Sequence, residues 1–369
     1  MKAKELRFLF LEPFFGGSHR DFAEGLVSHS QHAIDLLTLP SRFWKWRMRG
    51  AALHFARQVS GLNQYQGLIT SDLMSLSDFK AITGPDCPPS LVYFHENQLT
   101  YPLAPGETMD VQFGFTDITT GLAADRILFN SRTHLDAFFS ELPRFLRMMP
   151  EYRPNWVIDA IRSRSEVLYP GCQFPAKDEA VHISDQRPPL IIWNHRWEFD
   201  KNPRDFFLAL DAVIDRGHDF RLALLGENFQ MVPKEFIAAK DRYGKRIVQY
   251  GYEESKDAYC EWLRRGSVVI STATQENFGI SIVEAVRYGC IPLLPFRLSY
   301  PEILPRSFHN DFLYKGQDEL IEKLCTVIGN LKRFHADAGR LSRQMGRFSW
   351  ETLIPSYDAE LEKLSRMTS

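Results

Sequence analysis

The chain has 369 residues, 44% of them hydrophobic and 24% charged, which predicts two domains with their own cores, while its net charge of −2 excludes a globally basic protein. No apolar segment is long enough to span a bilayer and the N-terminus lacks the apolar core of a signal peptide, so we expect a cytoplasmic protein without a membrane partner. The five cysteines are odd in number and far apart, which favours reduced thiols over disulfides or a zinc site.

Strand-like apolar runs alternate with helical stretches twice along the chain, which predicts two doubly wound α/β domains. In the first half the expected strands are residues 7–12, 33–39, 67–70, 90–95, 126–130 and 166–169. In the second half they are residues 189–194, 221–226, 246–250, 267–271 and 290–295. A polar, proline-containing linker at about residues 175–189 separates the halves, so we predict domains at 1–178 and 179–348, followed by an amphipathic stretch at 349–369.

The loop after the first expected strand is a candidate ligand site, because ligands of open α/β sheets collect beyond the carboxyl ends of the strands. It contains Gly16, Gly17, Ser18 and His19. The glycines lack the spacing of the G-x-G-x-x-G motif, so dinucleotide binding is unsupported. The structural alternative is a tight strand-to-helix turn that Ser18 caps.

The loop after the fourth expected strand is unusually polar for the end of a buried strand. It contains His95, Glu96, Asn97 and Gln98. A single histidine in such a place is more often a structural hydrogen-bonding residue than a catalyst. For a second polar cluster, residues 110–117, a structural role is at least as well supported as a ligand site.

The most informative feature is a pair of carboxylates, Glu276 and Glu284, that brackets Gly279. An apolar, β-branched run precedes the pair and helical spacing follows Gly279, so the pattern predicts a strand, a loop and a helix. Glu276 then lies in the loop and Glu284 in the helix. The N–H groups of Phe278, Gly279 and Ile280 would form an anion site at the helix N-terminus. Carboxylates on both sides of an anion site suit a sugar nucleotide, which has hydroxyls on both sides of its pyrophosphate.

This carboxylate pair, with Phe-Gly inside it, resembles the signature of retaining GT-B glycosyltransferases, and residues 193–202 resemble the first loop of that family's C-terminal domain. The resemblance implies two Rossmann-like domains facing a central cleft, with residues 349–369 crossing back to the first. It also implies that Arg196 and Lys201 hold the donor pyrophosphate, the first as a planar fork and the second as a point charge. The other donor contacts implied are Gly16, Gly17, Gly226, Tyr250, Gly251, Tyr252, Glu276, Asn277, Phe278, Gly279, Ile280 and Glu284.

The same resemblance implies a retaining transfer, in which the sugar leaves a nucleoside diphosphate from the face that the acceptor hydroxyl attacks. Arg196, Lys201 and the helix N-terminus after Glu276 would neutralise charge on the leaving pyrophosphate. Glu276 would bind sugar hydroxyls, Glu284 the ribose, and His95 the transferring sugar. Because the chain has no Asp-x-Asp tract, we expect catalysis without a metal or another cofactor.

A closer resemblance extends over nearly the whole chain. Residues 10–19 (FLEPFFGGSH), 70–73 (TSDL), 93–102 (YFHENQLTYP) and 194–198 (NHRWE) are similar to the tRNA-queuosine mannosyltransferase family. This resemblance implies transfer of mannose from GDP-mannose to the cyclopentene diol of queuosine in the tRNA anticodon loop. The acceptor contacts implied are Ser18, His19, Glu96, Asn97 and Gln98.

An RNA acceptor fits residues 42–57, which interleave cations with aromatic rings and contain no acidic residue. Cations pair with phosphates, while rings stack on unpaired bases. The RNA contacts predicted here are Arg42, Trp44, Lys45, Trp46, Arg47 and Arg49. The alternative is an amphipathic helix whose rings face the core and whose charges are solvated. Arginines between residues 144 and 164 could extend the surface, although acidic neighbours favour a solvated face there.

Two other functions remain open. A GT-B transferase acting on a lipid, a glycan or a small molecule would keep the donor residues but would not need the cationic patch. A non-catalytic RNA-binding relative would keep the patch and need no donor. The sequence leaves open the choice between mannose and galactose, the donor nucleobase, the tRNA species, the oligomeric state and the extent of domain closure.

Overall fold

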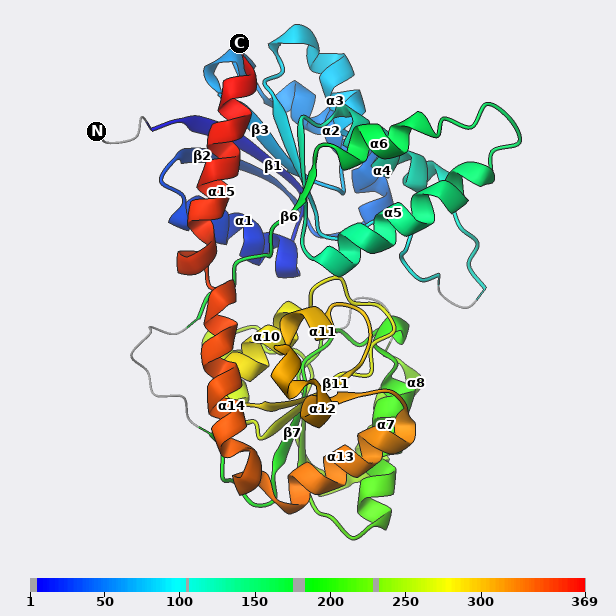
Figure 1. Ribbon diagram of the computed structural model, residues 1–369, viewed down its shortest axis with the longest axis vertical. Coiled ribbons are helices and arrows are strands. Elements are labelled where there is room, and N and C mark those ends of the chain that lie inside the picture. The colour runs from blue at the N-terminus through cyan, green and yellow to red at the C-terminus, as the bar shows by residue number, and fades with distance from the viewer. Residues whose placement is uncertain (1–4, 104–105, 175–182, 228–231, 369) are drawn as a thin grey trace. The chain divides into compact units, whose positions relative to one another are not determined.

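The computed structural model describes residues 5–103, 106–174, 183–227 and 232–368. The chain forms two compact units: unit 1 comprises Met1–Gln173 and Phe348–Ser369, and unit 2 comprises Phe174–Arg347. Each unit contains a six-stranded sheet with helices around it (Figure 1). The domain boundary predicted at residue 178 lies outside the described residues.

The sheet of unit 1 has the order β2-β1-β3-β4-β5-β6, and all its neighbouring strands are parallel. Its strands are β1 (Arg7–Phe15), β2 (Ala33–Pro40), β3 (Gly67–Ser71), β4 (Ser90–Phe94), β5 (Arg126–Phe129) and β6 (Ser165–Val167). Its helices are α1 (Gly17–His29), α2 (Trp44–Gln58), α3 (Leu76–Thr83), α4 (Val111–Ala123), α5 (Arg132–Arg147), α6 (Trp156–Arg162) and α15 (Trp350–Ser365). Strands β3 and β4 are buried along their whole length, as central strands covered on both faces should be. The strands predicted in the first half of the chain are confirmed.

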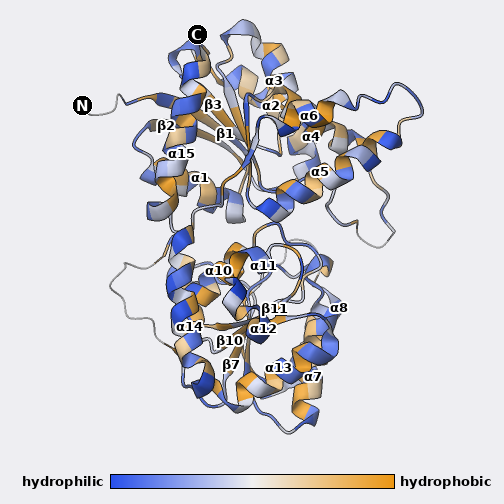
Figure 2. Cartoon of the chain, viewed as in Figure 1, coloured by the Kyte–Doolittle hydropathy of each residue, from blue (hydrophilic) through white to orange (hydrophobic). Residues whose placement is uncertain are grey.

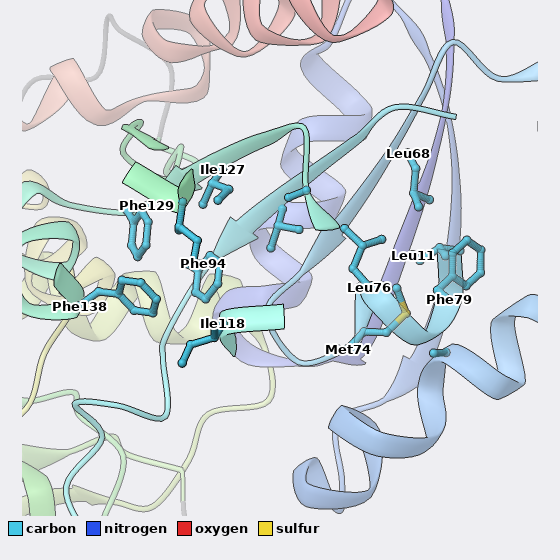
Figure 3. Packing of buried hydrophobic residues seen from close by; sticks show 14 of the residues in the cluster. Leu11, Leu68, Met74, Leu76, Phe79, Phe94, Ile118, Ile127, Phe129 and Phe138 are labelled. Atoms are coloured by element: carbon cyan, nitrogen blue, oxygen red, sulfur yellow. The ribbon is translucent and has the colours of Figure 1, made fainter. Parts of the chain in front are cut away.

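Two apolar clusters fill the two sides of the unit 1 sheet. One packs beneath α2 to α6 and includes Leu11, Phe94 and Phe129 (Figure 3). The other lies against α1 and α15, where the ring of Trp350 is 5.7 Å from that of Phe22. The C-terminal helix α15 is therefore part of the core of unit 1, although the chain of unit 2 precedes it.

The sheet of unit 2 has the order β12-β11-β10-β7-β8-β9 and is also parallel. Its strands are β7 (Leu190–Trp193), β8 (Arg221–Leu224), β9 (Ile247–Tyr250), β10 (Val268–Ile270), β11 (Ile291–Pro295) and β12 (Leu313–Tyr314). Its helices are α7 (Pro203–Asp215), α8 (Lys234–Tyr243), α9 (Lys256–Arg265), α10 (Ile280–Arg287), α11 (Tyr300–Ile303), α12 (His309–Phe312), α13 (Gln317–Gly329) and α14 (Leu331–Met345). The strands predicted here are confirmed, but β12 was not predicted because two residues are too few to produce a strand pattern.

Short 3₁₀ helices connect several of these elements: η1 (Leu62–Gln64), η2 (Gly84–Asp86), η3 (Phe199–Lys201), η4 (Gly244–Arg246), η5 (Arg306–Phe308), η6 (Gly346–Phe348) and η7 (Arg366–Thr368). The central strands of both sheets are mostly hydrophobic, and the outer faces of the helices are mostly polar (Figure 2). Within the described part of the chain, no helix combines the length and the hydropathy that crossing a bilayer requires.

Candidate functional site

The predicted cation Lys201 and the predicted carboxylate Glu276 lie on loops that follow two neighbouring strands, β7 and β10. Lys201 is buried at the end of η3, and its Nζ donates to the carbonyl of Gln275 at 2.7 Å. The same Nζ is 3.1 Å from Asp200 Oδ2 and 3.4 Å from Glu276 Oε2. Burial disfavours the charge of Lys201, but Glu276 and Asp200 outweigh it and raise the pKa of the amine. The structure thus brings a protonated Lys201 and Glu276 together.

Arg196 lies on the same loop as Lys201 and is exposed, with its Nη2 3.3 Å from Glu198 Oε2. The preceding His195 is buried, and burial lowers its pKa to about 3, with Lys201 adding to the effect. This imidazole is therefore neutral, and its Nδ1 lies 3.5 Å from the hydroxyl of Ser281 in α10. The loop after β7 consequently carries two cations, one at the surface and one buried, beside a neutral histidine.

The loop after β10 has the strand, loop and helix order that the sequence predicts. Gly279 is the N-cap of α10, and its φ of 94° is in the left-handed region that favours glycine. The N–H groups of Ile282 and Val283 both donate to the Gly279 carbonyl at 3.1 Å, so the hydrogen bonds of the helix begin at its N-cap. Ser299 fixes the loop by donating to the carbonyl of Phe278 at 2.8 Å. The predicted places of Glu276 before the helix and Glu284 within it are confirmed.

Glu284 is a buried carboxylate that other side chains hold from two directions. Lys256 Nζ donates to its Oε1 at 2.6 Å, and the hydroxyl of Tyr259 donates to its Oε2 at 3.0 Å. Asn194, at the end of β7, donates to the Tyr259 hydroxyl at 3.1 Å and to the Ser281 carbonyl at 2.7 Å. Sequence reasoning missed Lys256 and Tyr259, because α9 lies far from both acidic residues in the chain and only the fold brings it to Glu284.

The remaining predicted donor residues of unit 2 follow β8 and β9, except Asn277, which lies in the loop after β10. A Cβ atom at Gly226 would overlap the carbonyl of His195, so close packing by itself accounts for glycine there. Tyr250 is half-buried and its ring is 4.7 Å from that of Trp197, whereas Tyr252 is exposed. Gly251, between the two tyrosines, has a φ of 116°. Asn277 is half-buried and accepts from Gln275 Nε2 at 3.1 Å.

In unit 1, strand β1, the first turn of α1 and the loop after β4 bring Glu12, His19 and His95 into one buried cluster. His19 Nδ1 is 3.2 Å from Glu12 Oε1, and the two imidazole rings have centroids 4.0 Å apart. Glu12 Oε1 also accepts the N–H of Phe14 at 2.8 Å and the hydroxyl of Ser71 at 3.1 Å. One ligand atom from each of Glu12, His19 and His95 lies within 4.8 Å of the others, which is a set that could bind a divalent cation. The same contacts equally describe a hydrogen-bonded Glu12–His19 ion pair.

The two histidines have opposite protonation preferences. Burial opposes the charge of His19, but the charge of Glu12 and its hydrogen bond outweigh burial and raise the pKa. For His95, burial lowers the pKa well below its usual value, and His19 and His134 lower it further. His19 therefore holds a proton more readily than His95, and the carbonyl of His95 accepts from Asn130 at 2.8 Å.

Two buried carboxyl groups, Asp72 and Asp117, support the His95 loop. Asp117 belongs to the polar cluster at residues 110–117, and its contact is the structural role that the sequence analysis weighed for that cluster. Asp72 Oδ1 accepts the N–H of His95 at 2.8 Å, and Asp117 Oδ2 accepts the N–H of Gln98 at 2.6 Å. Burial raises the pKa of Asp72 to about 8, against the opposing charge of His19. Burial also raises the pKa of Asp117 well above its usual value, against the N–H of Gln98. The loop is thus held by the side chain directly after the neighbouring strand β3 and by one from α4.

The predicted acceptor residues on the His95 loop differ in their surroundings. Asn97 is buried, and its Oδ1 accepts the N–H groups of Leu99 and Thr100 at 3.0 Å each, so its side chain forms the turn. Glu96 and Gln98 are half-buried, with Gln98 Nε2 3.4 Å from Glu96 Oε1. We therefore retain Glu96 and Gln98 as candidate ligand contacts and assign Asn97 to the turn.

The glycine turn after β1 is built differently from the expected cap. The N-cap of α1 is Gly16, without a side-chain capping bond, and the exposed Ser18 lies inside the first turn, so the structural alternative of a Ser18 cap was wrong. A Cβ at Gly16 would overlap the side chain of Ser41, and Gly17 has a φ of 51°. Packing therefore explains Gly16, and backbone conformation explains Gly17.

The predicted RNA contacts lie on and just before α2, and they separate into inner and outer residues. The exposed ones are Arg42, Lys45, Trp46 and Arg49, with Trp46 76% exposed. Trp44 is half-buried, with its ring 5.1 Å from that of Phe113 in α4. Arg47 is half-buried and donates to the Pro40 carbonyl. The helix packs one tryptophan inward and presents the other to solvent with its cations, so the amphipathic alternative describes Trp44, and RNA contact stays a prediction for the exposed residues.

The fold and the loops after β7 and β10 define a class of protein. The family described as "Glycosyl transferases group 1" matches residues 176–332. Two solved structures have the same fold. Sucrose-phosphate synthase from Thermosynechococcus elongatus has a TM-score of 0.73 and 14% identity, and the match covers 98% of this chain and 100% of that one. The HepE protein of Anabaena with UDP-glucose has a TM-score of 0.68 and 14% identity, and the match covers 97% of this chain and 100% of that one. The chain is a glycosyltransferase with the two-domain α/β GT-B fold.

Two further similarities narrow the class. The family "tRNA-queuosine alpha-mannosyltransferase N-terminal" matches residues 7–172. The tRNA-queuosine alpha-mannosyltransferase of Drosophila melanogaster is 33% identical over 370 aligned residues, which cover 97% of each chain. This protein belongs to the tRNA-queuosine alpha-mannosyltransferase family. A GDP-mannose:cellobiosyl-diphosphopolyprenol alpha-mannosyltransferase of Xanthomonas campestris is 19% identical over 45% of each chain.

Proposed function

We propose that this protein transfers mannose from GDP-mannose, with retention of configuration, to the cyclopentene diol of queuosine in a tRNA anticodon loop. The observation that carries the proposal is the meeting of Lys201, Glu276 and the N-terminus of α10 on adjacent loops, in a chain that matches a family member over 97% of its length. Function as a glycosyltransferase explains why a buried cation, a carboxylate and a helix N-terminus lie together.

In the proposed reaction the bond between the mannose anomeric carbon and the β-phosphate oxygen breaks, and a bond to the acceptor oxygen forms on the same face. The acceptor proton passes to the leaving phosphate. Lys201 remains protonated and, with Arg196, balances the charge that develops on GDP. The helix dipole of α10 acts in the same direction on a phosphate at its N-terminus. These groups stabilise the transition state more than the ground state, because the leaving phosphate gains charge as the bond breaks.

The carboxylates then have binding roles. Glu276 accepts hydrogen bonds from mannose hydroxyls, and Glu284 accepts from the ribose while Lys256 and Tyr259 hold it in place. The neutral His95 contacts the transferring sugar, because a buried imidazole without charge can donate or accept a hydrogen bond. Glu96 and Gln98 contact the acceptor. Remaining donor contacts belong to the backbone at Tyr250 and Gly251 and to the exposed Tyr252.

We further propose that transfer needs no bound cation, because Lys201, Arg196 and α10 supply positive charge on the donor side. Full activity after dialysis against EDTA supports this part. Loss of activity in EDTA that one divalent cation restores contradicts it and makes Glu12, His19 and His95 the candidate ligands of that cation.

The α2 segment supports an RNA acceptor. Arg42, Lys45 and Arg49 are exposed beside Trp46, and this combination suits a phosphate backbone with unpaired bases. A lipid or glycan acceptor would have no need of it. Charge reversal at Arg42 and Lys45 therefore distinguishes the two acceptor classes.

The decisive experiment incubates the purified protein with queuosine-containing tRNA and GDP-mannose, without added metal, and identifies the nucleosides by mass spectrometry. UDP-galactose serves as the alternative donor. Glu276→Ala tests the site, and Glu322→Ala, an exposed residue of α13, is the matched control. We expect a hexose on queuosine with GDP-mannose, no product with Glu276→Ala and normal product with the control. GDP-mannose binding without transfer to queuosine would reject the acceptor, and product from UDP-galactose alone would reject the donor.

A further inference from the structure

A second surface of unit 1 exposes large aromatic rings and arginines together. Between α5 and the start of α6, Tyr152 is 87% exposed, Trp156 65% and Met148 58%. Arg144, Arg147 and Arg153 are exposed around them, and Glu151 is the single acidic residue between positions 144 and 156. We define the 144–156 surface as these six apolar and cationic residues. Its composition differs from a solvated charged face, because two aromatic rings and a thioether remain in water.

The segment that presents these rings is fixed at both ends. Phe145 and Leu146 of α5 are buried on one side, and Val157 of α6 is buried on the other. Arg153 Nε donates to the Met149 carbonyl at 3.0 Å and closes the connection. Tyr152 has a φ of 49°, an unusual value for a non-glycine residue. A short anchored connection with this backbone directs the Tyr152 ring into solvent rather than letting it collapse onto the core.

Packing contacts connect the segment that carries this surface to α2 through the first turns of α4. On one side Trp44 packs on Phe113 at 5.1 Å, and Arg49 Nη2 donates to the Gln112 carbonyl at 3.1 Å. On the other side the ring of Phe115 in α4 is 5.1 Å from that of Phe145 in α5. Helices α2, α4, α5 and α6 all pack on the same cluster of the sheet and lie on the same side of it (Figure 1). Contacting residues thus connect the proposed RNA contacts with the 144–156 surface.

We propose that the 144–156 surface is a second RNA-binding surface, which contacts the acceptor tRNA away from the nucleoside that reacts. The proposal rests on the proposed function. Arg144, Arg147 and Arg153 pair with phosphates, and Tyr152 and Trp156 stack on bases or riboses. An RNA is favoured over a protein partner because three exposed arginines flank the rings in the chain and outnumber the nearby carboxylates. These are Glu151 and Glu141, the second of which pairs with Arg144 at 3.0 Å. An excess of cations complements a polyanion.

The test measures binding of the full-length protein to queuosine-containing tRNA by fluorescence anisotropy at several salt concentrations. One variant carries Tyr152→Ala and Trp156→Ala, and a second carries Arg147→Glu and Arg153→Glu. Arg366→Glu, at the C-terminal end of α15, is the matched charge-reversal control on the other side of the sheet. Thermal unfolding and GDP-mannose binding are measured for every variant, so that a folding defect is recognised.

We expect each double variant to weaken tRNA binding about tenfold, a size within the range for loss of one stacked base. In the arginine variant, the slope of the log binding constant against log salt concentration should become shallower by about one to two, the amount expected for one or two lost phosphate contacts. GDP-mannose binding should stay unchanged, and Arg366→Glu should bind tRNA within twofold of wild type. If both folded double variants bind tRNA within twofold of wild type, the 144–156 surface is not an RNA contact and the proposed function stands. If the wild-type protein binds no tRNA, both proposals are overturned.

Discussion

Replacing Lys201 with methionine should both destabilise unit 2 and abolish donor binding. Lys201 Nζ lies 3.1 Å from Asp200 Oδ2, and only 1% of the Asp200 side chain is exposed. Methionine keeps most of the volume of lysine, so the change removes a charge and leaves little cavity. The consequence is a buried Asp200 carboxylate that has lost its cation.

The magnitude follows from this geometry. Two unit charges 3.1 Å apart attract by about 5 kcal/mol at an effective dielectric constant of 20. Part of this attraction only offsets desolvation, and breaking a buried pair by removing one partner costs about 3–5 kcal/mol. Glu276 adds little to the cost, because its side chain is 17% exposed and can be hydrated. For a unit of this size, a loss of 3 kcal/mol lowers the melting temperature by roughly 6–12 °C.

Thermal unfolding and calorimetric titration with GDP-mannose measure the two effects separately. The double variant Asp200→Asn with Lys201→Met removes both charges, so it should recover most of the stability and still fail to bind the donor. Lys332→Met, an exposed change in α14, is the control and should alter neither property. Wild-type melting behaviour in Lys201→Met would refute the argument for a buried ion pair, and normal GDP-mannose affinity in the double variant would refute the donor role.

Three further changes test other parts of the structure. Gly226→Ala places a Cβ against the carbonyl of His195 and should cost at least about 2 kcal/mol of unfolding free energy, measured by urea denaturation; an unchanged midpoint would contradict this packing. Tyr259→Phe removes the hydroxyl that donates to Glu284, so it should raise KM for GDP-mannose about fivefold with a smaller change in kcat. An effect on kcat alone would argue against binding of the donor ribose by Glu284. Burial raises the pKa of the Asp72 carboxyl from 3.8 to about 8. Between about pH 4 and pH 8 the folded state therefore keeps the carboxyl proton that the unfolded state has lost, so the free energy of unfolding falls as the pH rises through this range. Asp72→Asn should flatten this dependence in a series of melting curves, whereas a parallel curve would show that Asp72 does not contribute.

The placement of the strands and of Glu276 and Glu284 could be predicted from local pattern. Each of these patterns lies within about ten neighbouring residues. A buried parallel strand is apolar along its whole length, and a helix that begins after a strand needs a specific turn, here at Gly279. Glu276 and Glu284 accordingly lie where the sequence puts them. The exception, β12, is two residues long and forms through pairing with β11.

The partners of these residues depended on contacts between distant segments. Lys256 and Tyr259 reach Glu284 from α9, and Asp72 reaches the N–H of His95 from the end of β3. The parallel order of the strands determines the second meeting, because it places the loops after the neighbouring strands β3 and β4 at one edge of the sheet. The first meeting has another cause: β9 and β10 are not neighbours, and helices α9 and α10 contact each other directly.

Orientation around a helix or a turn was likewise decided by tertiary packing. The α2 segment contains two tryptophans of similar local context, yet Trp44 packs on Phe113 and Trp46 faces solvent. The sequence alone determined the α/β fold class, the order of the strands along the chain and the places of Glu276 in a loop and Glu284 in a helix, because each depends on short-range pattern. Only the tertiary structure decided which side chains are buried, paired or exposed, because these properties depend on which segments pack against each other.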